Sequence, residues 1–190
     1  QITNNPIAPK NPVIKCDSDA NKDGFIAFNL NTDATPQILS GLPSGLIVEY
    51  YLTENDAVLQ NNPLSNNYTN TTVNEQIIYA RIVNGPDCFG ITSIKLEVIV
   101  FTPANFNDEI VYLCDGNPKT ISVANGFSSY LWSNGATTSF TSIATAGNYT
   151  VTTSNTQGCV ASKKFIAIAS GIATITSVEI NDFSGNENSV

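Results

Sequence analysis

The feature that most constrains the fold of this chain is a series of short segments in which apolar and polar residues alternate. The clearest is 91–101, where the residues from Ile94 to Val100 alternate between an apolar face and a face carrying Lys95 and Glu97. Period-two alternation indicates a β-strand with one buried face. Similar segments lie at 24–30, 46–52 and 76–83. Several short strands separated by turn signals predict a β-sandwich.

Proline-containing and asparagine-rich segments divide the chain. Thr102-Pro103 marks a boundary, because proline ends a strand and few contacts need to cross such a point. The predicted division is a linker at 1–11, a first module at 12–103, a smaller second module at 104–169 and a final segment at 170–190. We interpret the final segment as the first strand of a third module. An added strand of the second module and a disordered tail are the alternatives.

Turn and cap signals add local detail. Strands of the second module are predicted at 109–114, 119–123, 129–133, 138–143, 147–154 and 159–168. Asn134-Gly135 indicates a hairpin, because both residue types accept positive φ. In the first module, Thr53 stands three residues before Asp56 and Pro63 follows. This pattern predicts one short helix.

The aromatic residues allow two predictions about which side chains face inward. Trp132 lies in a predicted central strand, where a single tryptophan belongs to the core more often than to a sugar-stacking surface. Tyr50 and Tyr51 are consecutive in a predicted strand. Successive strand residues point to opposite faces, so one tyrosine should face inward and the other outward.

Composition excludes several classes of function. The net charge is −8 with Arg81 as the single arginine, which argues against nucleic-acid binding and anionic membrane surfaces. Histidine is absent, which removes the commonest general base and most catalytic zinc sites. Catalysis by a carboxylate pair alone stays possible in principle, yet no such pair stands out. No run of 18 apolar residues suggests a membrane span. We therefore predict a protein that is not an enzyme.

Four cysteines point to disulfides and an extracellular location. Cys16, Cys88, Cys114 and Cys159 are widely spaced, and none forms a CxxC pair. An even number of spread cysteines is typical of disulfide-bonded exported proteins. If each module folds on its own, the expected bonds are Cys16–Cys88 and Cys114–Cys159. Pairing between modules is the alternative.

One aspartate-rich segment, the aspartate loop (residues 17–24), carries a metal-site pattern. Counted from Asp19, oxygen ligands stand at positions one, three and five of a calcium loop, followed by glycine at six and a backbone carbonyl at seven. The residues concerned are Asp19, Asn21, Asp23, Gly24 and Phe25. Calcium prefers six to eight oxygen ligands, so this alternation favours a calcium site.

The second half of the calcium pattern is missing, since Leu30 stands where a bidentate acid is needed. Asp17 and Asp33 are nearby in sequence, and a Cys16–Cys88 bond would bring Asp87 close as well. The predicted ligand set therefore adds Asp17 and Asp87 to Asp19, Asn21, Asp23 and Phe25. A polar turn without metal is the alternative.

Several of these segments resemble a known group of proteins. Residues 16–30, 48–57, 77–89, 112–118 and 130–159 resemble the Ig-like or PKD-like repeat modules of large cell-surface proteins in flavobacteria and other Bacteroidetes. Residues 177–190 resemble the opening of a further module. The resemblance implies an all-β fold of two tandem Ig-like β-sandwich modules. It also implies export by the type IX secretion system and a role in adhesion or gliding motility.

The expected function is a structural or adhesive extracellular segment of a secreted or surface-anchored protein, rigidified by calcium. Expected partners are neighbouring modules of the same chain, surface glycans, other cell-surface proteins and the secretion machinery during export. A carbohydrate-binding accessory module of an exported enzyme is the alternative.

Overall fold

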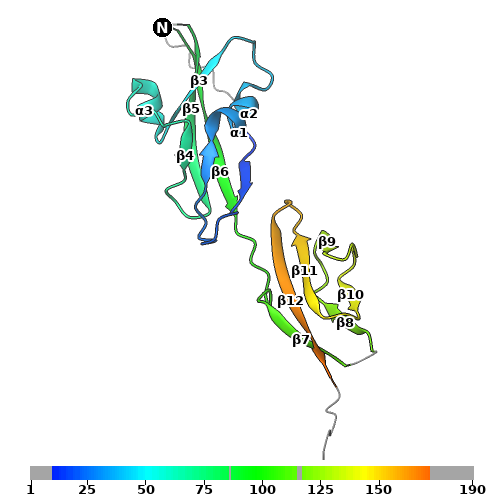
Figure 1. Ribbon diagram of the computed structural model, residues 1–190. Helices are drawn as coiled ribbons and strands as arrows, with labels where there is room; N and C mark the ends of the chain where they lie inside the picture. The colour runs from blue at the N-terminus through cyan, green and yellow to red at the C-terminus, as the bar shows by residue number, and fades with distance from the viewer. Residues whose placement is uncertain (1–9, 86, 115–116, 172–190) are drawn as a thin grey trace, which may run out of the picture.

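The computed structural model describes residues 10–85, 87–114 and 117–171, and Figure 1 shows them as two modules arranged end to end. The predicted linker at 1–11 and the final segment at 170–190 lie almost entirely outside these ranges. Among the residues described, no helix is long and apolar enough to cross a membrane.

The first module contains one large and one small sheet. The large sheet has the order β1-β6-β5-β3, with β1 parallel to β6 and the other neighbours antiparallel. The small sheet pairs β2 with β4. The strands are β1 (Val13–Cys16), β2 (Ala27–Asn29), β3 (Ile47–Tyr51), β4 (Asn67–Thr69), β5 (Glu75–Asn84) and β6 (Asp87–Ile99).

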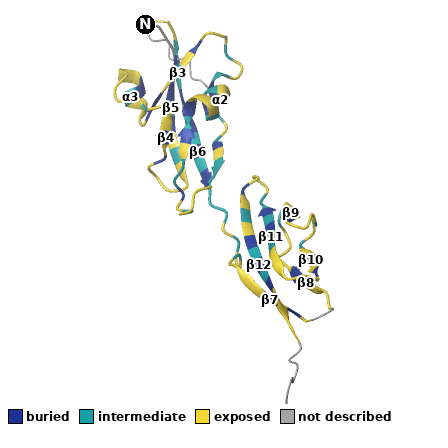
Figure 2. Ribbon diagram, viewed as in Figure 1, coloured by how far each residue is buried: buried dark blue, intermediate teal, exposed yellow. Residues whose placement is uncertain are grey.

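The core of the first module lies between its two sheets. The alternating residues Ile94, Leu96 and Val98 of β6 are all buried, as predicted, and Phe28 of the small sheet is fully buried with them. Figure 2 shows this buried stripe along β5 and β6. The period-two pattern therefore places the inner face of the large sheet correctly.

In the described part of the first module, three short helices connect the strands, whereas one was predicted. Helix α3 (Glu54–Leu59) begins where expected, because the Thr53 side chain accepts a hydrogen bond from the Asp56 backbone N–H. Helices α1 (Leu30–Asp33) and α2 (Thr35–Leu39) were not predicted. They are a single turn or little more, too short to produce a helical period in the sequence.

The second module repeats the topology of the first. Its large sheet has the order β7-β12-β11-β9, again with the first strand parallel to the last, and its small sheet pairs β8 with β10. The strands are β7 (Glu109–Cys114), β8 (Lys119–Ser122), β9 (Ser129–Trp132), β10 (Phe140–Ile143), β11 (Gly147–Ser154) and β12 (Val160–Ser170). Each of the six strands thus has a counterpart in the first module.

The strand order and two aromatic contacts define the class of fold. In an immunoglobulin sandwich, strands C, F and G share one sheet and strands B and E are neighbours on the other. Both modules have this order, with their third, fifth and sixth strands as C, F and G. Trp132 is 2% exposed on the C strand, and the Tyr149 hydroxyl donates to the Thr145 carbonyl at 3.0 Å, as in a tyrosine corner. The chain is a tandem of Ig-like modules.

An apolar core replaces the disulfide that joins the two sheets of an antibody domain. The second cysteine of that bond would stand two residues after the corner tyrosine. Here that position is Val151, which is fully buried and packs with Ile121 and Phe165. The Trp132 and Phe165 ring centroids lie 5.6 Å apart. Trp132 is therefore part of the core, as predicted, and is not available as a sugar-stacking surface.

The alternation rule fails at the end of β3. Tyr50 and Tyr51 are both buried, at 4% and 1% exposure. Tyr50 faces the core, where its hydroxyl lies 2.9 Å from that of Thr35, and burial raises its pKa to about 12. Tyr51 points to the outer face, but α3 packs there against β3, β5 and β6. A covering helix on the outer face is a tertiary feature that the strand pattern does not reveal.

The predicted hairpin at Asn134-Gly135 is wrong. The segment does turn tightly, with Gly135 at φ +87° and its N–H donating to the Trp132 carbonyl. However, the flanking strands lie in different sheets, because β9 pairs with β11 and β10 pairs with β8. The turn carries the chain from one sheet to the other.

Candidate functional site

The two modules are joined by a disulfide between Cys16 and Cys159. Their Cα atoms are 5.3 Å apart, although the residues are 143 positions apart in sequence. Cys16 is the last residue of β1, and Cys159 immediately precedes β12. The bond therefore links the lower end of the first module in Figure 1 to the upper end of the second.

The predicted bond between Cys16 and Cys88 is wrong, and the strand register shows why. Cys16 pairs with Ile99 at the end of β6, whereas Cys88 stands eleven residues earlier on the same strand. At about 3.3 Å per residue, the two backbones are roughly 36 Å apart, far beyond disulfide reach. The neighbouring Asp87 lies at the same distant end, so it does not join the aspartate loop. The side chains of Asp87 and Cys88 lie outside the described residues.

The predicted bond between Cys114 and Cys159 fails for the same reason. Cys114 pairs with Ser170 at the end of β12, eleven residues beyond Cys159. Cys114 is a free, exposed cysteine at the far end of the second module. Each module closes its core without an internal bond involving Cys16, Cys114 or Cys159, and the one disulfide among the described residues crosses between modules instead.

Aromatic and polar contacts accompany the disulfide at the joint, which we define as Cys16, Cys159 and the connecting residues 100–108. Phe127 of the second module packs edge-on against Phe101 and Phe106 of the connection, with ring centroids 5.9 and 5.6 Å apart. Lys163 donates to the Asn105 carbonyl at 3.0 Å. The connection is thus packed against the second module.

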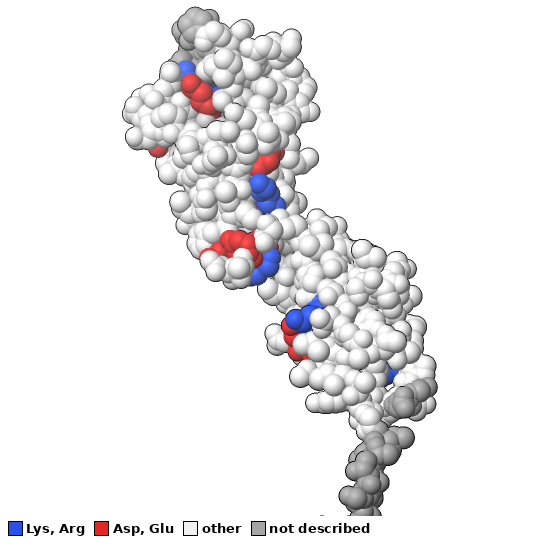
Figure 3. All heavy atoms as spheres, viewed as in Figure 1, with Lys and Arg blue, Asp and Glu red and all other residues white. Residues whose placement is uncertain are grey.

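A cleft of about 710 Å³ lies at the joint. It is lined by residues of the aspartate loop, by residues of the connection between Phe101 and Asn107, and by residues 160–162 of β12. Figure 3 shows acidic and basic side chains gathered at the end of the first module that faces the second. The cleft is therefore lined by charged residues of the first module and by residues 160–162 of the second.

Three carboxylates of the aspartate loop converge. Asp17, Asp19 and Asp23 each present one oxygen, and these oxygens lie within 4.8 Å of one another. Asp19 Oδ1 accepts from the backbone N–H groups of Asn21 and Lys22 at 2.9 and 3.1 Å. Asp23 Oδ1 accepts from the Phe25 N–H at 3.1 Å. Donors two or three residues further along the backbone thus hold the side chains of Asp19 and Asp23 in local turns.

Asp17 is the buried member of the group. It is 3% exposed and directly follows β1. Its N–H donates to the Ile99 carbonyl at 2.9 Å, which continues the pairing of β1 with β6. Its Oδ2 accepts from the Gly24 N–H at 2.8 Å, which closes the loop, while its Oδ1 is buried without a hydrogen-bond partner. A buried carboxylate oxygen without a partner is costly, and a bound cation would remove that cost.

Residues that the sequence did not single out hold the loop in place. The Asn70 side chain is 2% exposed, donates to the Gly24 carbonyl at 2.8 Å and accepts from the Ile26 N–H at 2.8 Å. The Asn74 N–H donates to the same carbonyl at 3.0 Å. Asn70 and Asn74 lie more than 40 residues away in sequence, so only the tertiary structure reveals these contacts.

The donor set suits a hard cation, with one opposing feature. Carboxylate oxygens on a short loop are ligands that Ca²⁺ prefers. Asn21 lies within the loop and Phe25 directly follows it, so the Asn21 side-chain oxygen and the Phe25 carbonyl oxygen stay candidate ligands. Lys22 opposes the cation, because its ammonium group donates to the Asp17 carbonyl and brings positive charge to the cluster.

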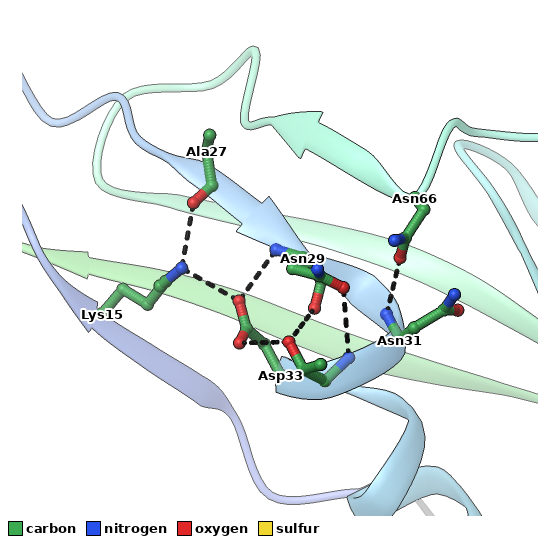
Figure 4. A network of polar contacts seen from close by, with 7 residues as sticks. Lys15, Ala27, Asn29, Asn31, Asp33 and Asn66 are labelled. Atoms are coloured by element: carbon green, nitrogen blue, oxygen red, sulfur yellow. Dashed lines mark hydrogen bonds and ion pairs between the residues drawn. The ribbon is translucent and has the colours of Figure 1, made fainter.

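Asp33 is not part of this site, because it belongs to a separate network that Figure 4 shows. Lys15 of β1 donates to Asp33 at 2.9 Å and to the Ala27 carbonyl at 3.0 Å, which ties β1 to the small sheet. Burial raises the pKa of Asp33, but hydrogen bonds from Lys15 and the Asn29 N–H outweigh it and lower the pKa. This network positions β1, and with it Cys16.

A family match agrees with this arrangement. Residues 12–104 match the family described as the Flavobacterium inter-domain disulphide bond domain. The matched residues include Cys16, while Cys159 lies beyond them, so the observed bond leaves the matched domain. The match covers the first module and agrees with the expected resemblance to flavobacterial modules. No curated protein matches the chain.

Solved structures with tandem immunoglobulin domains overlap only weakly with this chain. DIP-gamma IG1+IG2 has a TM-score of 0.32 and 12% identity, covering 86% of this chain and 95% of that one. Dpr2 Ig1-Ig2 in complex with DIP-Theta Ig1-Ig3 has a TM-score of 0.28 and 14% identity, covering 85% and 65%. The N-terminal four Ig domains of Dscam1 isoform 1.9 give 0.27 and 12%, covering 66% and 38%. The chain thus spans less than two thirds of the latter two. The strand order of the two modules, and not these overlaps, defines the class of fold.

Proposed function

We propose that this chain is a non-catalytic, extracellular spacer whose two modules are held in a defined orientation by a covalent joint. The Cys16–Cys159 bond carries this proposal, because it crosses between modules instead of closing either one. Stable disulfides are a feature of oxidising compartments, which supports an extracellular location.

The bond restricts the relative motion of the modules. A connection of residues 100–108 alone would allow hinge bending, since tandem domains move relative to one another unless their interface is large and apolar. The disulfide adds a second covalent link between the modules, close to this connection. The disulfide and the connection together close a covalent ring at the joint. A spacer built in this way keeps its length and direction under load, which suits a structural or adhesive role.

The disulfide also stabilises the folded chain. For a loop of 143 residues, the chain-entropy model gives about 5 kcal/mol, an upper figure that native-state effects reduce. Cys16→Ser should therefore lower stability and loosen the joint together. Cys114→Ser is the matched control, because it removes an exposed cysteine that is not bonded.

The distance between the modules tests the rigid joint. Spin labels placed on exposed sites, one on each module, should give a narrow distance distribution in the native chain and in Cys114→Ser. The distribution should broaden in Cys16→Ser. An equally narrow distribution in Cys16→Ser would show that the disulfide does not restrain the modules, and the proposal would fail.

We further propose that the aspartate loop binds Ca²⁺ and stiffens the base of the first module. The supporting observation is the buried, unpartnered Oδ1 of Asp17 beside the carboxylates of Asp19 and Asp23. The loop lines the cleft at the joint, so an ion there would brace the first module where the second is attached.

Calcium-dependent melting tests this site. Because a ligand that binds only the folded state stabilises it, Ca²⁺ at about 100 times its Kd should add about 2.7 kcal/mol. Asp17→Asn should abolish the increase in melting temperature, and Lys22→Ala should enhance it. Glu54→Gln on α3 removes an equal charge elsewhere and should leave it unchanged. Equal melting temperatures in calcium and in chelator would rule the site out.

The narrower role in adhesion or gliding motility, with export by the type IX system, is a proposal supported by the flavobacterial family match and by the resemblance of both modules to surface repeats. The proposed partners are neighbouring modules and ligands on other cell surfaces. Deleting residues 12–169 from the surface protein that contains them, and measuring attachment and gliding, would test it. Unchanged attachment and gliding would remove this role.

A further inference from the structure

The repeated topology places Cys114 in the same position as Cys16. Cys16 is the last residue of the first strand of its module and pairs in parallel with Ile99, the last residue of the last strand. Cys114 is likewise the last residue of the first strand of the second module and pairs with Ser170, the last residue of β12. An aspartate follows each cysteine in the sequence. The bonded cysteine and the free one are therefore structural equivalents.

The other two cysteines are equivalent in the same way. Cys159 immediately precedes the last strand of the second module, and Cys88 is the second residue of the last strand of the first. Each follows an asparagine by four residues, Asn155 and Asn84 respectively. The Asn155 side chain accepts from the Cys159 N–H at 2.8 Å, which orients the turn before the strand.

Each module thus carries one cysteine at each end. The cysteine that ends the first strand lies at one end of the module, and the cysteine at the start of the last strand lies at the opposite end. At the joint, Cys16, which ends the first strand of one module, bonds to Cys159, which immediately precedes the last strand of the next. In Figure 1 the ends of β7 and β12 point away from the first module, so Cys114 lies at the opposite end of the pair from Cys88. The chain has one further cysteine of each kind. Cys88 lies at the outer end of the first module, and Cys114 lies at the outer end of the second.

We propose that Cys114 forms a second inter-module disulfide, and that its partner is the cysteine at the start of the last strand of another module of this kind. Cys88 is the example of such a cysteine in this chain. The inference extends the proposed spacer, because the bonding rule seen once at the joint would then continue along a row of modules. Cys114 would be the outgoing half of the next joint, as Cys16 is of this one.

Two observations distinguish Cys114 from an ordinary surface thiol. It is exposed, so a second module can reach it, and its structural equivalent is bonded in this same structure. The reaction also balances in an oxidising compartment. Two thiols lose two protons and two electrons to an external disulfide, such as oxidised glutathione, which is released as two thiols.

A mixing experiment tests the pairing with the full chain. The variant Cys88→Ser retains Cys114, the variant Cys114→Ser retains Cys88, and both retain the Cys16–Cys159 bond. Equal amounts are mixed at high concentration in a glutathione redox buffer, and the disulfide-linked dimers are identified by mass and non-reducing peptide mapping. If the pairing is specific, we expect the amount of the mixed dimer, linked from Cys114 to Cys88, to exceed the summed amount of the two homodimers by about tenfold.

Pairing without structural preference gives a different result. If the thiols react at random, the mixed dimer and the two homodimers together form in equal amounts, and that outcome would overturn the proposal. Absence of the mixed dimer would overturn it as well. The rigid-joint proposal is tested on Cys16→Ser by inter-module distances, so either proposal can fail without the other.

Discussion

The two modules share one strand topology but differ in the size of their apolar cores. Among the described residues, the first buries an apolar cluster of 14, whereas the second buries 8, with Trp132 and Phe165 packed against each other. The first also carries three helices and the aspartate loop. Small domains bury a smaller share of their surface and are correspondingly marginal. The same topology is thus built around a larger core in the first module and a smaller core in the second, and a disulfide joins the two.

Among substitutions that affect a single module, the largest expected effect comes from deleting the central side chain of the smaller core. Trp132→Ala removes a side chain that is 2% exposed and should cost the second module about 3–5 kcal/mol. Ile78→Ala in the first module should cost about 2–5 kcal/mol there. Hydrogen exchange, resolved by module during urea unfolding, measures both.

These two variants test whether the modules unfold separately. Each should lower protection mainly in its own module, because the two apolar clusters share no residue. Equal loss of protection in both modules from either variant would show that the joint makes the chain a single cooperative unit. The contrast between the modules would then not extend to their stability.

A smaller effect is expected at glycines with positive φ. Gly24 in the aspartate loop has φ +83°, and a Cβ there would lie 2.3 Å from Asn74 Oδ1. Gly126 in the second module has φ +101° with open space around it. Gly24→Ala should therefore cost about 2–3 kcal/mol, and Gly126→Ala about 1 kcal/mol, by thermal unfolding. Similar costs would mean that the loop adapts to the added methyl group.

The smallest effect is a pH dependence confined to the first module. Because the folded-state pKa of Asp33 is lowered, the folded chain binds this proton less readily than the unfolded chain. The stabilisation is fully present above the ordinary value of 3.8 and is lost as the pH falls through the lowered pKa. The partly exposed Lys15–Asp33 pair should contribute about 1 kcal/mol or less.

Asp33→Asn provides the comparison. The native chain should be more stable than the variant near pH 7, and this advantage should shrink below about pH 4, where Asp33 becomes protonated. Thermal unfolding between pH 2 and 7 measures the difference. A constant difference over that range would contradict the role given to this carboxylate.

Local patterns predicted most of the strands, since alternation depends only on neighbouring residues. The alternating residues of β6 and the burial of Trp132 follow from such patterns. The cap at Thr53 needed only the next three residues, and it correctly predicted α3. The same reasoning failed at Tyr51, where a helix covers the outer face of the sheet.

The candidate site was only partly predictable. The carboxylates of Asp17, Asp19 and Asp23 converge because they lie on one short loop, as their spacing indicated. Asp87 was included only through an assumed disulfide, and the register of β1 against β6 places it at the other end of the module. Asn70 and Asn74, which hold the loop, carry no local signal of that role.

The sequence by itself determined that the chain forms two β modules and carries a loop of converging carboxylates, because strand period, turn residues and short-range spacing are local properties. The tertiary structure alone decided which cysteines meet. In both modules the first strand runs parallel to the last, which separates the cysteines within each module by the length of a strand. The end-to-end arrangement then brings Cys16 to Cys159, so the bond joins the modules.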